Sequence, residues 1–186
     1  MAENTQIKKV IFTETGLDEE YDNCEFMNCT FTEIQFKRIY FTHCKFTQCN
    51  LSLCKMNSTS WTDVEFIDCK MTGIEFTYCN NYSLSLRFTN TNLHYALFVG
   101  LNLQGTQFYG CNLQEADFSE ANLKGASFKN CDLALAVFAN TNLEKADFST
   151  AYNFQIDPIS NKLRKAIFSR LSLEGLVSTF DVLIVD

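Results

Sequence analysis

Large apolar residues recur at every fifth position along most of this chain of 186 residues. A first run extends from Phe26 to Phe76, and a second run, displaced by two residues, extends from Phe88 to Phe148. Between the two runs, Asn81 stands where the first run would place its next apolar residue. A fixed period of this kind indicates an array of short structural repeats, and it restricts the possible folds more strongly than local propensity does.

A period of five fits neither the 3.6 residues per turn of an α-helix nor the simple alternation of a flat strand. An extended triplet directs its first and third side chains to one side, and two further residues turn the chain toward the next side. Four such sides would close one coil, and coils would stack at a strand spacing of about 4.8 Å. Because Phe and Leu alternate from Phe88 onward, two opposite sides should stack Phe and the other two Leu. The predicted fold class is all-β.

The nine cysteines keep the same period. Each stands two residues before a central position, in a slot that Ala, Thr, Ile, Val or Leu fills in other units. A disulfide framework needs paired cysteines and an oxidising compartment. Structural zinc sites use cysteines about two to four residues apart, which is closer than any pair in this chain. We therefore predict small, reduced, inward-facing side chains, and we expect neither a metal nor a cofactor.

The charge of the chain limits its partners. With 15 Lys and Arg against 22 Asp and Glu, the net charge is -7, which argues against direct binding to nucleic acid. The sequence has neither a long apolar run for a membrane span nor a secretion signal at its start, so we expect a cytoplasmic protein. His43 and His94 fall at outward positions, and no Gly-rich phosphate loop accompanies them, so we predict that the protein is not an enzyme.

Several units resemble a known repeat motif. Ala116–Glu120, Ala121–Gly125 and Ala146–Thr150 are similar to the A(D/N)LXX motif of pentapeptide-repeat proteins. That resemblance covers about residues 21–150, continues more weakly to Phe168, and implies a right-handed quadrilateral β-helix. It divides the chain into an N-terminal cap (1–20), the β-helix (21–168) and a C-terminal cap (169–186). A register fault at 77–87 and an interruption at 151–160 break the array.

Within that family, three stretches resemble the Qnr-type quinolone-resistance proteins and their chromosomal relatives. They are Phe88–Phe98, Cys111–Phe118 and Ala151–Asp157. The resemblance implies a DNA-mimicking, dimeric rod that binds type II topoisomerases, DNA gyrase and topoisomerase IV, and protects them from fluoroquinolones. Many Qnr proteins carry two longer loops that support protection, whereas this array has only the two-residue fault. The alternative is a generic interaction scaffold with another protein partner.

Charge and residue type suggest where a partner would bind. Acids outnumber bases by eight to two in residues 1–36 and by seven to three in residues 111–161. A stiff rod with acidic stretches resembles the phosphates of a duplex. At the fault, tyrosine and arginine are residue types enriched at interfaces. The candidate partner-binding residues are Tyr82, Arg87, Glu115, Asp117, Glu120 and Asp147.

Both ends of an open β-helix need cover, because they expose unpaired strand edges. At the start, we expect the apolar cluster Val10, Ile11 and Phe12 to cap the first coil. At the end, residues 172–180 are predicted to form a short helix, followed by a strand-like segment at Val182–Val185. Apolar residues there either cover the last coil alone or also form a two-fold dimer interface. These candidates are Leu173, Leu176, Val177, Phe180 and Leu183.

Overall fold

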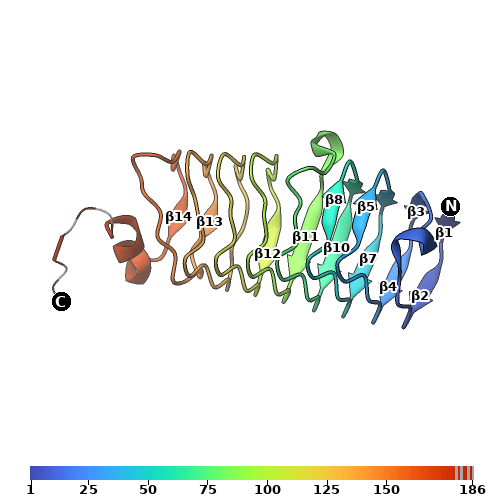
Figure 1. Ribbon diagram of the computed structural model, residues 1–186. Helices are drawn as coiled ribbons and strands as arrows, with labels where there is room; N and C mark the ends of the chain where they lie inside the picture. Colours follow the sequence, from blue (N-terminus) through green and yellow to red (C-terminus); the bar gives the residue numbers. More distant parts are fainter. Residues whose placement is uncertain (179, 181, 184, 186) are drawn as a thin grey trace.

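The computed structural model describes residues 1–178, 180, 182, 183 and 185, and it is a rod of stacked four-sided coils (Figure 1). The chain begins at one end of the rod and leaves at the other. All strand pairs of the described residues are parallel, as stacked coils of one hand require. This architecture confirms the predicted all-β solenoid.

The four sides are called faces 1 to 4, in the order in which the chain meets them from β2 onward. Face 1 holds β2 (Gln6–Lys8), β4 (Glu25–Met27), β7 (Lys45–Thr47), β10 (Val64–Ile67), β11 (Leu86–Thr89), β12 (Gln107–Tyr109), β13 (Asp147–Phe148) and β14 (Ile167–Phe168). Face 2 is a ladder of single bridges from Ile11 to Tyr152. Face 3 holds β5 (Gln35–Lys37) and β8 (Lys55–Asn57), and face 4 holds β1 (Ala2–Glu3), β3 (Glu20–Asp22), β6 (Tyr40–Thr42) and β9 (Ser60–Thr62). Short 3-10 helices occur at η1 (Glu14–Gly16), η2 (Asn81–Ser83) and η3 (Arg170–Leu176), and no helix of the described residues is long and apolar enough to cross a membrane.

The central residues form four columns inside the rod. On face 1, phenylalanine rings from Phe26 to Phe168 stack with centroids between 4.5 and 5.3 Å apart. Opposite them on face 3, Phe98, Phe118 and Phe138 stack at 5.1 and 5.2 Å. From Phe88 onward, leucines fill the other two columns, as the alternation predicted, and nearly all of the central side chains are fully buried. The columns confirm the five-residue period as the source of the core.

Each regular corner needs one residue in the left-handed conformation, the second after a central position. Asn28 has φ 54° and Glu120 has φ 61°, and glycine occupies several other corners. Tyr78 and Thr150 also stand at corner positions, but neither has a positive φ. Each directly precedes an irregular segment of the chain. The residue before a central position holds the turn: Asn112 Oδ1 accepts the Gln114 N–H at 3.0 Å. This side-chain turn is the physical reason for Asn or Asp in the repeat motif.

The cysteine slots carry hydrogen bonds as well as volume. All nine cysteines are buried and free, which confirms their inward position. Cys49 Sγ donates to the Phe26 carbonyl at 3.4 Å and accepts the Cys29 N–H at 3.4 Å. Thr91 Oγ1 does the same for the Phe66 carbonyl and the Cys69 N–H. A thiol or hydroxyl in this slot therefore links backbone groups of successive coils, which alanine cannot do. Burial raises the pKa of Cys54 to about 12, so its thiol stays protonated.

At the register fault, the extra residues leave the rod as a loop around η2. Phe66 pairs with Phe46, but Leu86 pairs with Val64, so the offset between coils grows from 20 to 22 residues. Asn81 does not enter the core. Its Oδ1 accepts the Asn102 N–H at 2.8 Å, and the side chain therefore substitutes for the strand that is missing from face 4.

The N-terminal segment is a coil rather than a separate cap. Ala2 pairs with Tyr21 and Ile7 pairs with Phe26, so residues 1–20 continue the ladder. Phe12 stacks on Phe31 at 4.5 Å and covers the core as predicted. The same expectation is wrong for Ile11, which is 79% exposed, because it holds the outward position of its triplet.

The five-residue count continues without insertion or deletion through residues 151–160, but the backbone leaves the ladder after Tyr152. Phe154 and Ile156 turn into the core, whereas Asn153 and Pro158, which stand at central positions by count, are exposed. The Ile156 N–H bonds to the Gly175 carbonyl of η3 at 2.9 Å instead of to the coil beneath it. This contact draws the segment out of the ladder.

The C-terminal cap differs from the prediction in its elements. The helix is η3, Arg170–Leu176, rather than 172–180, and Ser169 Oγ caps it by accepting the Leu171 N–H. The expected strand at Val182–Val185 is wrong for the described residues Val182, Leu183 and Val185, which lie in no strand, while Ile184 lies outside the described residues.

Candidate partner-binding surfaces

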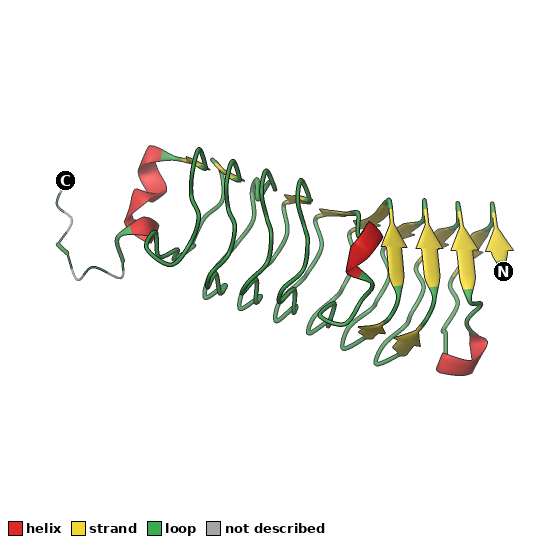
Figure 2. Ribbon diagram, turned by 90° about the horizontal axis from the view of Figure 1, so that it is seen from above, coloured by secondary structure: helices red, strands yellow, loops and turns green. Residues whose placement is uncertain are grey.

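The fault loop projects from face 4 near the middle of the rod (Figures 1 and 2). Asn80 Oδ1 accepts the Tyr82 N–H at 3.1 Å and so begins η2. Tyr82 at the tip is 100% exposed. The Tyr82 ring is therefore accessible to solvent, and its role in partner binding stays a prediction.

Arg87, the second candidate at the fault, is already engaged. It lies on β11, and its guanidinium donates to Asp63 at 2.6 Å and to Glu65 at 2.5 Å. Both carboxylates belong to the coil before the loop, so Arg87 closes the fault electrostatically. Its interactions account for the arginine without a partner.

The four candidate acids lie on two opposite faces. Glu115, Asp117 and Glu120 come together on face 3 and its two corners. Asp147 lies on face 1. Glu115 accepts a hydrogen bond from His94 or shares an ion pair with it at 3.3 Å, whereas Glu120 is exposed at its corner. The four candidate acids therefore do not lie on one surface.

Two of these acids also maintain the fold. Asp117 Oδ1 accepts the Ser119 N–H at 2.8 Å, and Asp147 Oδ1 accepts the Ser149 N–H at 2.9 Å. Partial burial opposes ionisation of Asp147, but hydrogen bonds from Ser149 and Lys129 outweigh it and lower its pKa. The Asp147 carboxylate therefore remains charged at neutral pH while it stabilises a corner.

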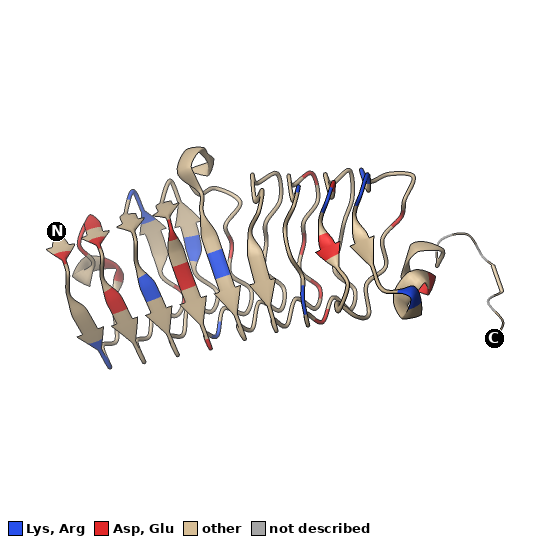
Figure 3. Ribbon diagram, turned by 180° about the vertical axis from the view of Figure 1, so that it is seen from behind, with Lys and Arg blue, Asp and Glu red and all other residues tan. Residues whose placement is uncertain are grey.

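The outer side of face 1 carries no continuous acidic stripe. Its outward residues alternate in sign from Glu25 through Lys45 and Glu65 to Arg87, as Figure 3 shows on the strands of this face. Alternating charges on adjacent strands attract one another and largely cancel at a distance. Face 1 therefore does not present a run of like negative charge.

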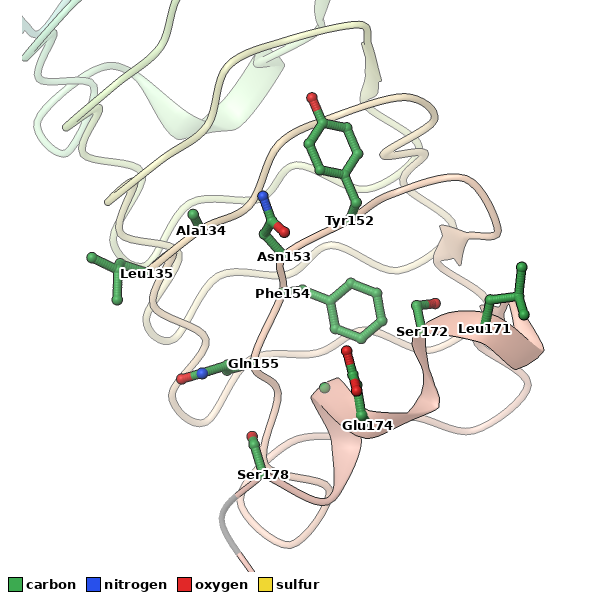
Figure 4. Close-up of a pocket in the computed structure, with 11 residues that line it drawn as sticks. Ala134, Leu135, Tyr152, Asn153, Phe154, Gln155, Leu171, Ser172, Glu174 and Ser178 are labelled. Carbon is green, nitrogen blue, oxygen red and sulfur yellow. The ribbon is translucent and has the colours of Figure 1, made fainter. Parts of the chain in front are cut away.

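A hollow of about 610 Å³ opens at the C-terminal end, where the chain leaves the ladder (Figure 4). Its coil side is formed by Ala134 and Leu135, and its opposite wall by residues 152–155. Leu171, Ser172 and Glu174 of η3 close one end, and Phe154 points toward this helix. The volume lies in the range of about 300–1,000 Å³ typical of ligand pockets.

Gly175 fixes how closely η3 approaches the coil. A Cβ built on this residue would lie 2.3 Å from the Phe154 carbonyl oxygen and 2.8 Å from its ring. The contact therefore admits only glycine. It holds one wall of the hollow in place.

The apolar residues predicted to cover the last coil or to form a dimer interface divide by exposure. Leu176 packs against the core. Val177 is half-buried, while Leu173, Phe180 and Leu183 are exposed. Leu171, which the sequence reasoning did not select, is 93% exposed. The exposed residues form an apolar end of the rod that no described residue of the chain covers.

No group of His, Cys, Asp and Glu side chains in the described part of the chain is arranged to hold a metal ion. The sequence reasoning missed Leu135, Phe154 and Gly175, which build the hollow. Leu135 had a signal, since a leucine at a corner slot departs from the Asn, Gly and Glu found in most other units.

Comparisons with known proteins agree with this geometry. A family model described as a pentapeptide repeat region matches residues 20–98 and 101–177. Two trypsin-treated variants of QnrB1, described as a plasmid-mediated fluoroquinolone resistance protein, have TM-scores of 0.61 and 0.59 at 16% identity and cover 99% or more of both chains. HetL, a pentapeptide repeat protein involved in heterocyst differentiation regulation in the cyanobacterium Nostoc, has a TM-score of 0.48 at 17% identity, covering 95% of this chain and 89% of its own. No curated protein sequence matches the chain.

Proposed function

The chain belongs to the pentapeptide-repeat family, and we propose that it is a non-enzymatic DNA mimic that binds DNA gyrase or topoisomerase IV and protects it from fluoroquinolones. The observation that carries the proposal is the end-to-end match to QnrB1, which includes the irregular C-terminal segment as well as the coils. The proposed site of action is the cytoplasm, where the topoisomerases are found.

The surface that suits mimicry best is face 3 with its corners. Glu115, Asp117 and Glu120 stand there at successive positions around one coil. The stacked phenylalanine columns make the rod stiff, so these charges are held at fixed spacing. Fixed anionic charges on a narrow rod would compete with a duplex for a positively charged channel.

A supercoiling assay tests the proposal. Purified gyrase is inhibited by ciprofloxacin with and without the protein, and direct binding is measured by surface plasmon resonance. We expect restored supercoiling, direct binding, and displacement of the protein by duplex DNA. Binding that duplex DNA does not displace would contradict DNA mimicry. Absence of binding together with unchanged inhibition by ciprofloxacin would contradict gyrase as the partner.

The proposal also includes a homodimer formed through the exposed C-terminal residues. Leu171, Leu173 and Leu183 are available for a two-fold interface. Sedimentation at micromolar concentration should give the mass of two chains, and Leu171→Lys should give one. A wild-type monomer under these conditions would show that the C-terminus is only a cap.

A second candidate function is an interaction scaffold for another protein. Two observations favour the scaffold: charges alternate in sign on face 1, and Arg87 forms ion pairs with Asp63 and Glu65. Together they leave less acidic surface than a mimic of a duplex along the whole rod needs. Affinity capture from a native lysate, with gyrase subunits monitored in parallel, separates the two functions. Capture of a different partner without gyrase favours the scaffold.

A further inference from the structure

The last regular coil has an open strand edge on face 3. In the coil before it, the Glu115, Phe118 and Glu120 N–H groups donate to the next coil, to the carbonyls of Ala134, Val137 and Ala139. The corresponding donors one coil later belong to Leu135, Phe138 and Asn140. Among the described residues, none of these three N–H groups donates a hydrogen bond.

An acceptor on the same edge is also unused. The Ala116 carbonyl accepts the Val137 N–H at 2.9 Å, but the Ala136 carbonyl, its counterpart, receives no hydrogen bond in the described part of the chain. Donors and acceptor keep the spacing of a parallel ladder, because the coil beneath uses the same pattern. The edge is therefore formed and lacks only a strand.

The cause of the opening is the departure of residues 152–156. Ile156 bonds to Gly175 of η3, and Phe154 packs against the same glycine, so this segment follows the helix instead of face 3. The gap between it and Leu135 is the hollow described above. Ala136 and Phe138 are each 6% exposed, whereas Ala116 and Phe118 beneath them are 0% exposed. The core is thus slightly uncovered where the strand is missing.

The side chains around the edge define what would fit. Leu135 and Val137 are 67% and 44% exposed and offer apolar contacts. From His94 to Ser160, face 3 and its corners contain no Lys or Arg. The acids on that surface are Glu115, Asp117, Glu120 and Asp157, and Glu174 lines the hollow. An incoming strand would therefore meet negative charge beside apolar surface.

We propose that this edge is a docking site for an extended segment of a partner protein that carries alternating apolar and basic side chains. The segment adds a parallel strand beside residues 135–140, and its backbone carbonyls accept hydrogen bonds from the three unused N–H groups. Its apolar side chains contact Leu135 and Val137, and its basic side chains face the surrounding carboxylates. This site shares the acids of face 3 with the proposed topoisomerase interaction, but its open strand edge does not depend on that interaction.

Amide hydrogen exchange tests the edge directly. In the free protein, the Leu135, Phe138 and Asn140 amides should exchange faster than those of Glu115, Phe118 and Glu120. A short synthetic peptide of alternating valine and lysine is the probe, and it should slow the first three amides by about tenfold or more. The same peptide with glutamate in place of lysine should not.

Matched variants locate the binding. Val137→Lys places a positive charge on the open edge and should abolish peptide binding measured by fluorescence anisotropy. Leu97→Lys makes the same kind of change on face 3, two coils earlier, where the ladder is paired on both sides, and should leave binding unchanged. Equal losses of peptide binding in both variants would show that the added positive charge acts wherever it is placed, which would overturn the proposal. Amides that are already protected in the free protein, or protection that rises with protein concentration alone, would also overturn it, because the edge would then be closed or occupied by a second copy.

Discussion

At the scale of single residues, each position of the five-residue unit has a separate physical role. The central residue fills the core, the residue before it holds the corner through its side chain, and the residue two positions after it accepts a positive φ. Asp117 shows that a charge on the surface can serve the fold, since its carboxylate receives the Ser119 N–H. Removing one side chain therefore tests one role.

Phe108→Ala should lower the free energy of unfolding by about 3–5 kcal/mol. Phe108 is fully buried and its ring stacks at 5.1 Å on both Phe88 and Phe128, so no neighbour can fill the cavity without breaking a column. Urea denaturation measures the loss. Tyr109→Ala, at the adjacent exposed position, serves as the control and should change stability by about 0.5 kcal/mol or less.

Acid should destabilise the protein through its turn-forming aspartates. Partial burial raises the pKa values of Asp132 and Asp147, but hydrogen bonds lower them further, so both lie below the ordinary value of 3.8. A carboxylate whose pKa is lower in the folded state than in the unfolded state stabilises the folded protein when the pH is above the unfolded-state pKa. That stabilisation is lost as the pH falls through the folded-state pKa. Urea midpoints between pH 7 and pH 2 should therefore fall below about pH 4. Asp147→Asn should flatten that decline, and an unchanged profile would assign the acid sensitivity to other groups.

At the scale of elements, the sequence predicted the regular coils and failed where the chain leaves them. The period specifies which residues face inward, so the columns and the position of the fault follow from counting. At Asn153 and Pro158 the count continues while the path changes, because Phe154 and Ile156 bury more apolar surface and because η3 lies close enough to bond Ile156. That contact joins segments about 20 residues apart through one glycine, which no local pattern records. The hollow and the open edge result from it and were not predictable.

Gly175→Ala should release η3 from the last coil. Its new Cβ would lie 2.3 Å from the Phe154 carbonyl oxygen, and the backbone cannot move away without breaking the bond from Ile156 to residue 175. We expect a loss of about 1–3 kcal/mol, with faster amide exchange at Ile156. Gly16→Ala is the control, because its Cβ would meet only Thr13 at 3.4 Å. Equal effects of the two substitutions would contradict the close approach.

Asn81→Ala tests how the fault is held. The Asn81 side chain accepts the Asn102 N–H, so its removal takes a ladder bond from face 4 without touching the core. A loss of about 1 kcal/mol is expected in urea denaturation. Tyr82→Ala, at the exposed tip of the same loop, should leave stability unchanged. If both variants are neutral, the loop contributes nothing to closing the fault.

At the scale of the whole molecule, the rod is a one-dimensional stack in which each coil contacts only its neighbours. Parallel ladders and stacked rings repeat along it, so stability should be a sum of coil and interface contributions. The period of one coil is 20 residues outside the fault, as the pairing of Phe46 with Phe66 shows. Length can therefore change only in whole coils if the columns are to remain aligned.

Deleting residues 111–130 should give a folded, shorter rod. Ala136 and Phe138 would then follow Ala96 and Phe98 on face 3, and cysteine, phenylalanine and leucine slots would all stay in their columns. Small-angle scattering should show a rod shortened by about 4.8 Å. Deleting residues 111–125 instead removes three of the four sides of a coil. The residues that follow then move by one side, so phenylalanines stack on leucines and the coils no longer align. That variant should unfold at a lower temperature than the whole-coil deletion. Equal thermal stability of the two would mean that the coils need no fixed register, and the stacked columns could not be what holds the rod together.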